Sequence, residues 1–443
     1  MNTVIQRIIF CLSLLLASCV SYKAKPLTAE HASADFSART LSDAGLKAFL
    51  AEQRSSGGSW TVDRLALAAA YYHPDVALAR AEAAEVTAAI QTAQMRPNPV
   101  FTFGPQFASN NVNTITPWFF AQSVTIPIET AGKRSRRTEQ ALAAAEAGRW
   151  RVSSRAWLAR SRVRTAMLEL HSARENIRLL GTEQGLHDQA IKKLTAQMDA
   201  GDVSPFELTQ ARLMLNRTRL ALQDAQRVAA TGEARLAAAV GVPLQALQAV
   251  RLDFTAFTRL RDVSSAAGRR RALTQRADLM ALLADYAAAE SALRLEIAKQ
   301  YPDVRLSPGY DYNAGQNRWQ LGLNLELPLN RNRGPIAQAE AKRKTAEARF
   351  LAQQSTIQGE IDIALAAYQT SRAKAATAAQ LAQEAAASSA TTQRMVEAGQ
   401  VSALELTRRQ IEASTANVAL LAAQIEAQTA AGALEDAMQA SLR

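Results

Sequence analysis

Two stretches decide the fold of this chain: AGDVSPFELT at residues 200–209 and AGQVSALELT at residues 398–407. They share the pattern A-G-x-V-S-x-x-E-L-T, and Gly399 follows Gly201 by 198 residues. In each stretch a glycine breaks a helix, and a serine with a glutamate three residues later has the signature of a capping box. Pro205 stands at the first helical position, where proline is favoured. The pattern therefore predicts the same helix–turn–helix tip twice.

Two further pairs of segments support a duplication. The segment SVTIPI at 123–128 corresponds to NLELPL at 324–329, 201 residues later. The segment RPN at 96–98 corresponds to YPD at 301–303, 205 residues later. Three blocks in the same order at nearly one offset indicate two copies of one supersecondary plan, each about 200 residues long.

Each copy is predicted to contain a helix, two strands, a long helix and a further helix. In the first copy these elements are expected at Val62–Gln94, Pro99–Phe107, Trp118–Ile128, 132–200 and 204–240. In the second they are expected at Ala277–Lys299, Asp303–Tyr312, Trp319–Leu329, 335–398 and from 402 onward. Residues 245–275 are expected to be irregular, and residues 20–60 form a polar leader without clear periodicity. The fold class is therefore mainly α with a small β part, built from duplicated long helical hairpins.

The predicted strands alternate apolar and polar residues. At Trp319–Leu329, for example, the odd positions are tryptophan or leucine. Each strand has about ten residues, the length that a tilted strand needs to cross a bilayer. Aromatic residues stand near the hairpin ends, where a membrane interface favours them: Trp118, Tyr310, Tyr312 and Trp319. The alternative is a small sheet on a soluble core, with its apolar face covered by helices.

A membrane sheet of four strands cannot leave its edges unpaired, because lipid offers no hydrogen-bonding partner. The membrane interpretation therefore requires oligomerisation, and three chains would supply the strands of a twelve-stranded transmembrane β-barrel. The helix at 335–398 has roughly 64 residues and a length of about 95 Å, so it needs neighbours along its whole length. The duplicated hairpins are thus expected to pack along neighbouring helices. A solvated coiled-coil rod without a pore is the alternative.

Composition excludes several function classes. The chain of 443 residues has 19 Gly and 13 Pro, few breakers for its length, which favours long helices. Its two cysteines, Cys11 and Cys19, cannot form a disulfide framework or a thiolate metal site. The four histidines are scattered, and no metal-ligand spacing or phosphate-binding loop occurs, so no cofactor and no catalytic residue is predicted. The net charge of +11 could suit nucleic acid, but a secretion signal argues against that partner.

That signal occupies residues 1–18. Arg7 precedes a short apolar run, Ile8–Ala17, which is too short to span a bilayer as a helix. The run ends in Leu-Ala-Ser before Cys19. A cysteine at the first mature position resembles a bacterial lipoprotein signal, so Cys19 is predicted to be lipidated. The alternative is a plain signal peptide with an incidental cysteine.

Together these features resemble the TolC family of outer-membrane efflux proteins. The resemblance rests on the lipoprotein signal, the duplicated helix–hairpin–helix plan, Pro-Asn-Pro before the first strand and the paired tips, and it covers the chain from about Ser59 onward. The segment IETAGKR at 128–134 is most similar to the CzcC-like cation-efflux branch. The domains expected on this basis are a signal peptide at 1–18, a lipidated leader at 19–60, a first repeat at 61–243, an equatorial segment at 244–275 and a second repeat at 276–443.

The resemblance implies a homotrimer in the cell outer membrane that extends into the periplasm, where the duplicated hairpins form a trimeric α-barrel. It implies partnership with a periplasmic adaptor protein and an inner-membrane pump of the resistance-nodulation-division type, which supplies the energy. The chain would be a passive gated conduit, not an enzyme, for heavy-metal cations. The alternatives are an outlet for drug efflux or type I protein secretion, a periplasmic adaptor, whose lipoyl-like segments are not found, and a structural coiled-coil lipoprotein.

The resemblance also assigns roles to the tips. Residues expected to contact the adaptor are Gly201, Val203, Ser204, Gly399, Val401 and Ser402. Glu207, Glu405 and Arg408 are expected to form the pore gate. Glu405 matches the first of two acidic positions that narrow the pore in the family, and Arg408 stands where the second would be. That departure argues against a double acidic ring. Because like charges repeated around an axis repel, Glu–Arg pairs between neighbouring tips are expected. Glu405 could instead serve only as a cap partner.

Overall fold

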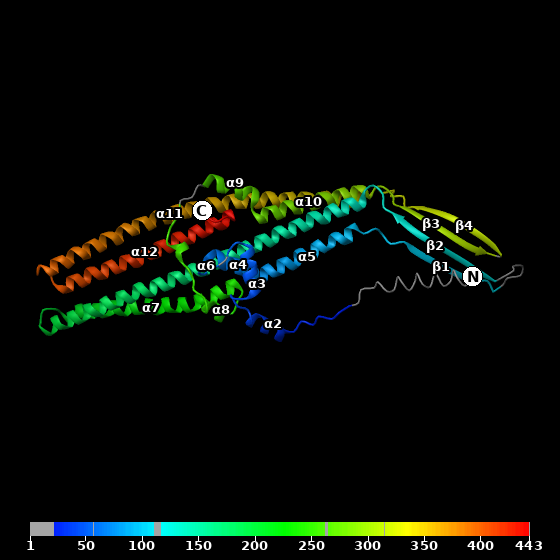
Figure 1. The fold of residues 1–443 in the computed structure, drawn as a ribbon. Helices are drawn as coiled ribbons and strands as arrows, with labels where there is room; N and C mark the ends of the chain where they lie inside the picture. Colours follow the sequence, from blue (N-terminus) through cyan, green and yellow to red (C-terminus); the bar gives the residue numbers. More distant parts are fainter. Residues whose placement is uncertain (1–21, 56, 110–116, 262–264, 314, 443) are drawn as a thin grey trace.

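The computed structural model describes residues 22–442, apart from residues 56, 110–116, 262–264 and 314. The molecule is elongated, with a four-stranded sheet at one end and two helical tips at the other (Figure 1). The first repeat contains α4 (Val62–Tyr72), α5 (Pro74–Gln94), β1 (Val100–Phe107), β2 (Trp118–Ile128), α6 (Lys133–Asp199) and α7 (Pro205–Val240). The second contains α10 (Ala277–Ala298), β3 (Val304–Asn313), β4 (Gln316–Leu325), α11 (Arg333–Glu397) and α12 (Ala403–Met438).

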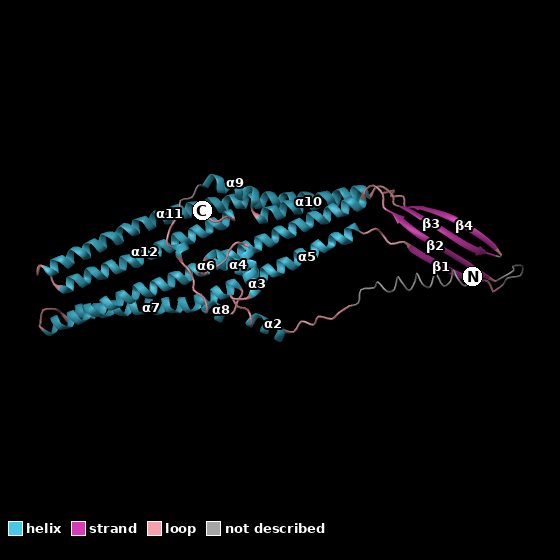
Figure 2. Ribbon diagram, in the orientation of Figure 1, coloured by secondary structure: helices cyan, strands magenta, loops and turns pink. Residues whose placement is uncertain are grey.

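This arrangement confirms the predicted mainly helical fold with duplicated long hairpins and a small sheet. The long helices α6 and α11 have 67 and 65 residues. At 1.5 Å per residue each is about 100 Å long. The hairpin α6–α7 lies beside the hairpin α11–α12, and both point away from the sheet (Figure 2). The described residues include no helix that is both long enough and apolar enough to cross a bilayer.

Three sequence predictions of local structure are wrong. The helix expected over Val62–Gln94 is two helices, because Pro74 has no N–H and its ring excludes the helical conformation at His73, which is extended (φ −66°, ψ 129°). The leader at 20–60 contains α2 (Ala29–Ser37) and α3 (Ala44–Glu52). The segment expected to be irregular contains α8 (Leu244–Gln248), the 3₁₀ turn η1 (Thr255–Phe257) and α9 (Ser265–Gln275). Side-chain caps on α2 and α3 stabilise helices too short to be detected from periodicity.

The four strands form one antiparallel sheet in the order β1-β2-β3-β4. The two repeats meet at its centre, where Ile128 pairs with Val304. The sheet projects beyond the helices (Figure 2), and its apolar side chains are uncovered, as the exposures of 64% for Phe101 and 84% for Trp319 show. The alternative of a sheet packed under helices is therefore wrong. In the described part of the chain, β1 and β4 each have one neighbouring strand, so the sheet has two open edges there.

β4 differs from its prediction at its end. The sequence pattern extends to Leu329, but the strand ends at Leu325, whereas its counterpart β2 continues to Ile128. Leu327 and Leu329 are 69% and 90% exposed. The apolar alternation is present, but the last residues of this segment have no neighbouring strand.

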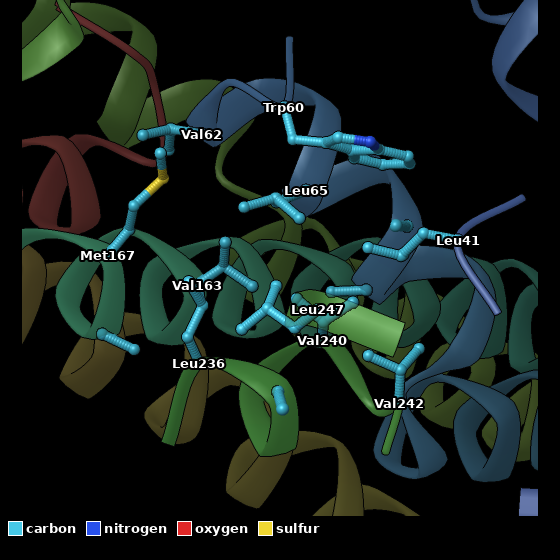
Figure 3. Packing of buried hydrophobic residues seen from close by; sticks show 14 of the residues in the cluster. Leu41, Trp60, Val62, Leu65, Val163, Met167, Leu236, Val240, Val242 and Leu247 are labelled. Atoms are coloured by element: carbon cyan, nitrogen blue, oxygen red, sulfur yellow. The ribbon is translucent and has the colours of Figure 1, made fainter. Parts of the chain in front are cut away.

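The main core lies where the leader meets the first repeat. Figure 3 shows Leu65 of α4 and Val163 of α6 packed with Leu236 of α7, and Leu41 of the leader at the same cluster. The guanidinium of Arg39 donates to the carbonyls of Tyr72 (3.1 Å) and Gly241 (2.9 Å), the C-terminal ends of α4 and α7. The leader is thus fixed to the middle of the molecule. A second cluster joins α10, α11 and α12.

Candidate functional site: the two helical tips

Each tip turns through a glycine in the left-handed region. Gly201 has φ 83° and Gly399 has φ 71°, a conformation that costs other L-residues energy. The N–H of Gly201 donates to the carbonyl of Met198, and that of Gly399 to the carbonyl of Val396, both at 3.0 Å. These bonds close the ends of α6 and α11 identically. The predicted glycine breaks are confirmed.

The predicted capping box is wrong at one tip and incomplete at the other. The hydroxyl of Ser402 accepts from the N–H of Glu405 at 3.2 Å. Ser204 makes no such side-chain bond, and its carbonyl instead accepts from the N–H of Glu207 at 3.1 Å. Among the described residues, neither glutamate side chain returns to its serine. Both carboxylates bind arginines instead.

These ion pairs arrange the charges at the tips. Arg408 on α12 lies 3.2 Å from the Glu207 carboxylate on α7, so this pair joins the two tips of one chain. Glu405 is paired within its own helix with Arg409 at 2.9 Å. Arg409 also binds Glu412 at 3.0 Å, and the hydrogen bond to Glu412 raises the pKa of the guanidinium. All these side chains are at least one-third exposed, so solvent screens each pair and its contribution to stability is small.

A lysine that the sequence did not single out makes the most buried polar link between the tips. Lys193 on α6 donates to the carbonyl of Ala403 at 2.8 Å and to the hydroxyl of Thr407 at 2.6 Å. Thr407 is 1% exposed. The bonds tie the first helical hairpin to the first turn of α12. No periodicity or motif distinguishes Lys193 from its neighbour Lys192, so sequence reasoning had no signal for it.

An apolar cluster holds the tips side by side. Its buried members come from α6, α7 and α12: Ala190, Leu194, Leu208 and Leu404. Val203 packs against the cluster from the first turn, so this candidate adaptor contact also has a structural role. Gly201, Ser204, Gly399 and Ser402 are exposed, and Val401 is half-buried. The structure thus leaves these five positions at least partly accessible at the end of the molecule.

The outer side of α7 carries an unpartnered apolar row. Phe206, Leu213 and Leu220 recur every seven residues and are 67%, 54% and 63% exposed. The corresponding residues of α12, Leu404 and Ile411, belong to the apolar cluster on the first hairpin. A seven-residue apolar spacing is typical of a helix that packs along another helix. Within the described part of one chain, the row on α12 packs against the first hairpin, whereas the matching row on α7 is exposed.

In the described part of the chain, no three His, Cys, Asp or Glu side chains are grouped as metal ligands would be. Cys19, the candidate lipid anchor, lies outside the described residues.

Comparisons with known proteins cover most of the chain. A family model described as "Outer membrane efflux protein" matches residues 67–242 and 269–439. The cobalt-zinc-cadmium resistance protein CzcC of Cupriavidus metallidurans is 23% identical over 344 residues, which are 76% of this chain and 80% of that protein.

Two solved structures show the same fold. The outer membrane protein VceC of Vibrio cholerae matches with a TM-score of 0.69 at 18% identity, over 86% of this chain and 97% of that chain. CusC, described through its folding and transmembrane channel formation, matches with a TM-score of 0.67 at 18% identity, over 87% of this chain and 95% of that chain.

Proposed function

This chain belongs to the outer membrane efflux protein family, and on that basis we propose that it is the outer-membrane channel of a tripartite efflux system. It acts as a passive, gated conduit across the periplasm and outer membrane, joined through a periplasmic adaptor to an inner-membrane pump of the resistance-nodulation-division type. Its cargo is heavy-metal cations.

The observation that carries this proposal is the division of the molecule into two unlike ends. One end is a sheet with a bare apolar face and two open edges, which three copies would close into a twelve-stranded barrel. The other end is a pair of tips about 100 Å of helix away. The apolar row of Phe206, Leu213 and Leu220 supports side-by-side packing of the helices of a trimer. The repeats at 61–243 and 276–443 are the two units that alternate around it, with 244–275 as the equatorial segment between them.

The tips are the proposed gate and adaptor surface. Three copies would bring six tips together at one mouth, and each glutamate would be repeated three times around the axis. Like charges at such distances repel unless cations pair with them. Arg408, already bound to Glu207, and Arg409, bound to Glu405, supply those cations. The accessible residues Gly201, Ser204, Gly399, Val401 and Ser402, with Val203 behind them, form the surface offered to the adaptor.

The metal cargo is supported by the similarity to a protein named for cobalt, zinc and cadmium resistance. An outlet for drugs or for type I protein secretion is the alternative within the channel class. A structural coiled-coil lipoprotein is the alternative outside it. Lipid anchoring at Cys19 belongs to the proposal, and equal acyl labelling of the wild type and Cys19→Ala would refute that part.

The experiment combines assembly with export. Detergent-extracted protein should have the mass of three chains by light scattering. Deletion of its gene in the host should raise cell-associated zinc, cobalt or cadmium after a metal challenge, and the intact gene should restore the wild-type level. A stable folded monomer in membranes would refute the channel. If the protein is a trimer but its loss causes cells to retain drug or a normally secreted protein, with metal unchanged, the proposed cargo would be wrong and the proposed channel would stand.

A further inference from the structure

The two repeats superpose in a definite register. The buried N-caps of α5 and α10, His73 and Arg276, are 203 residues apart. Two aromatic pairs with ring centroids 5.0 Å apart occupy the same place in the two hairpins: Phe107–Trp118 and Tyr310–Trp319. The first helix and first strand therefore repeat after 203 residues and the second strand after 201. In this register Pro99, not Pro97, corresponds to Pro302, which corrects the offset of 205 suggested by sequence.

Within the chain, the first turn of α6 is fixed to the second repeat. Lys133, 7% exposed, donates to the carbonyl of Tyr301 and to the carboxylate of Asp303, both at 2.7 Å. Thr130 donates from its N–H to Asp303 at 2.9 Å and from its hydroxyl to the Pro302 carbonyl at 2.6 Å. We call this contact the Lys133 junction. It lies beside Ile128 and Val304, the last residues that pair β2 with β3, so it marks this end of the central strand pair.

The second repeat presents the same element, which Asn332 binds to Glu296 of α10, but the described residues show no counterpart of the Lys133 junction there. α11 begins at Arg333 after two positive-φ residues, as α6 begins at Lys133, and both starting N–H groups bond three residues back at 3.2 Å. Arg333 is nevertheless exposed, and its side chain makes no hydrogen bond or ion pair with the described residues. The preceding Leu327 and Leu329 are exposed too. Among the described elements, helix α6 is flanked by α5 and α10, whereas α11 has α10 alone beside it in this half of the molecule.

We infer that the start of α11 and the end of the β4 segment dock on the α5–β1 connection of a second copy, in the register of the Lys133 junction. This inference rests on the proposed trimer and specifies its seam. The counterpart of Tyr301 in the first repeat, 203 residues earlier, is Asn98. Arg333, the counterpart of Lys133, therefore donates to the carbonyl of Asn98 of the partner subunit. That connection is free to receive it, because residues 95–100 are all exposed and Arg96–Pro99 form one wall of a groove of about 1030 Å³.

The same shifts fix the strand pairing across the seam. Ile126 of β2 pairs with Leu306 of β3 inside the chain. Moving β2 by 201 residues and β3 by 203 places Leu327 opposite Phe103 of the partner subunit. Residues 326–329 thereby gain the strand neighbour that residues 125–128 already have. This explains why the apolar alternation of the sequence continues past the observed end of β4.

The seam between copies differs from the junction inside a copy by one charge. The position of Asp303 is occupied by Val100 in the first repeat. Arg333 therefore meets a carbonyl but no carboxylate, and the contact between copies is weaker than the Lys133 junction. An acid at position 100 should supply the missing partner.

Cysteine cross-linking tests the register in the full-length protein. On oxidation, Leu327→Cys combined with Phe103→Cys should give covalent dimers and trimers on non-reducing gels. β1 and β4 of one chain are three strand spacings apart, about 14 Å, beyond the ~7 Å Cα limit of a disulfide, so a cross-link inside one copy is excluded. Ile126→Cys with Leu306→Cys is the positive control within a chain. The two single cysteine variants at 327 and 103 exclude pairing with Cys19.

Charge variants test the junction itself. The temperature at which the detergent-solubilised trimer dissociates should fall in Arg333→Met and rise in Val100→Asp. The gain from Val100→Asp should vanish in the Arg333→Met background. An absent cross-link or a gain independent of Arg333, in protein that is trimeric by light scattering, would overturn this seam and leave the proposed channel intact. A wild-type protein that is monomeric by light scattering would overturn both.

Discussion

The two repeats share one backbone plan but place different chemistry at matching positions. The buried cap between α4 and α5 is His73, whose ring accepts from the N–H of Asp75 at 3.1 Å. The matching cap of α10 is Arg276, which binds Asp278 at 2.7 Å, Glu360 at 2.8 Å and a backbone carbonyl near the end of α12. The cap of the first repeat is a small neutral ring that contacts Arg162, whereas the cap of the second repeat is itself a cation bound to two carboxylates. A duplicated backbone therefore does not imply duplicated energetics.

The largest effect expected from this comparison is at Arg276. Arg276→Met removes a buried cation, 7% exposed, and leaves the carboxylates of Asp278 and Glu360 without it. Because both carboxylates are partly exposed, the loss of stability should be about 2–3 kcal/mol, below the range for fully buried pairs. The thermal unfolding midpoint followed by helical circular dichroism measures it. Arg269→Met, which removes an exposed pair with Asp362, is the matched control and should be nearly neutral. Equal unfolding midpoints for Arg276→Met and Arg269→Met would show that the Arg276 cap stabilises the fold no more than an exposed ion pair does.

The second comparison is between the charges of the two tips. Arg408→Ala breaks the only described ion pair between the tips of one chain, and Glu405→Gln removes a charge held within its own helix. If these groups form the gate, both changes should alter single-channel conductance or cation selectivity in planar bilayers about twofold, with the Arg408 change larger. A cap-only role predicts that Glu405→Gln is silent, because glutamine also serves at that position. Unchanged conductance in both variants, with the trimer intact, would remove the residues from the gate.

The smallest expected effect is a pH dependence that only the first repeat has. Burial lowers the pKa of His73 below 6.5, and Arg162 lowers it further against the opposing charge of Asp75. A lowered folded pKa means that this stability is complete above pH 6.5 and is lost as the pH falls through the folded value. Each tenfold difference in proton affinity between the folded and unfolded chain corresponds to about 1.4 kcal/mol. His73→Asn, which can still cap a helix, should reduce the drop in unfolding midpoint between pH 7.5 and 5.5.

His31→Asn on the exposed surface of α2 provides the control for that measurement. His171 also has a pKa lowered by burial, so part of the pH dependence should survive in His73→Asn. A midpoint that falls as steeply in His73→Asn as in the wild type would show that the neutral cap carries no pH-dependent stability.

Much of the fold was predictable because its signals are long and repeated. The glycine breaks, the bounds of β2 and the long helices follow from periodicity and from paired motifs. The resemblance to the TolC family and its CzcC-like branch is confirmed by the family match and by the similarity to CzcC. The same match confirms the prediction of a transport channel that is not an enzyme.

The parts that could not be predicted depend on contacts between distant residues. The leader helices α2 and α3 are stable because Arg39 and Leu41 reach the core of the first repeat. Lys193 acquires its role only when α12 is placed against α6. The break at Pro74 is different, since proline after histidine was a visible local signal that the alanine-rich pattern obscured. For the candidate site, the sequence predicted the glycine turns, but not that Glu207 binds Arg408 of the other tip while Glu405 binds Arg409 of its own helix.

The open edges of the sheet have a kinetic consequence. The helical hairpins complete their hydrogen bonds within one chain, so their folding rate is independent of protein concentration. In the proposed trimer the outer edges of β1 and β4 are completed by encounter with other copies, so closure of the sheet is a reaction of higher molecular order. Dilution should therefore slow the second process and leave the first unchanged. Until that encounter, each chain presents unpaired strand edges beside bare aromatic side chains, which is the arrangement most prone to aggregate.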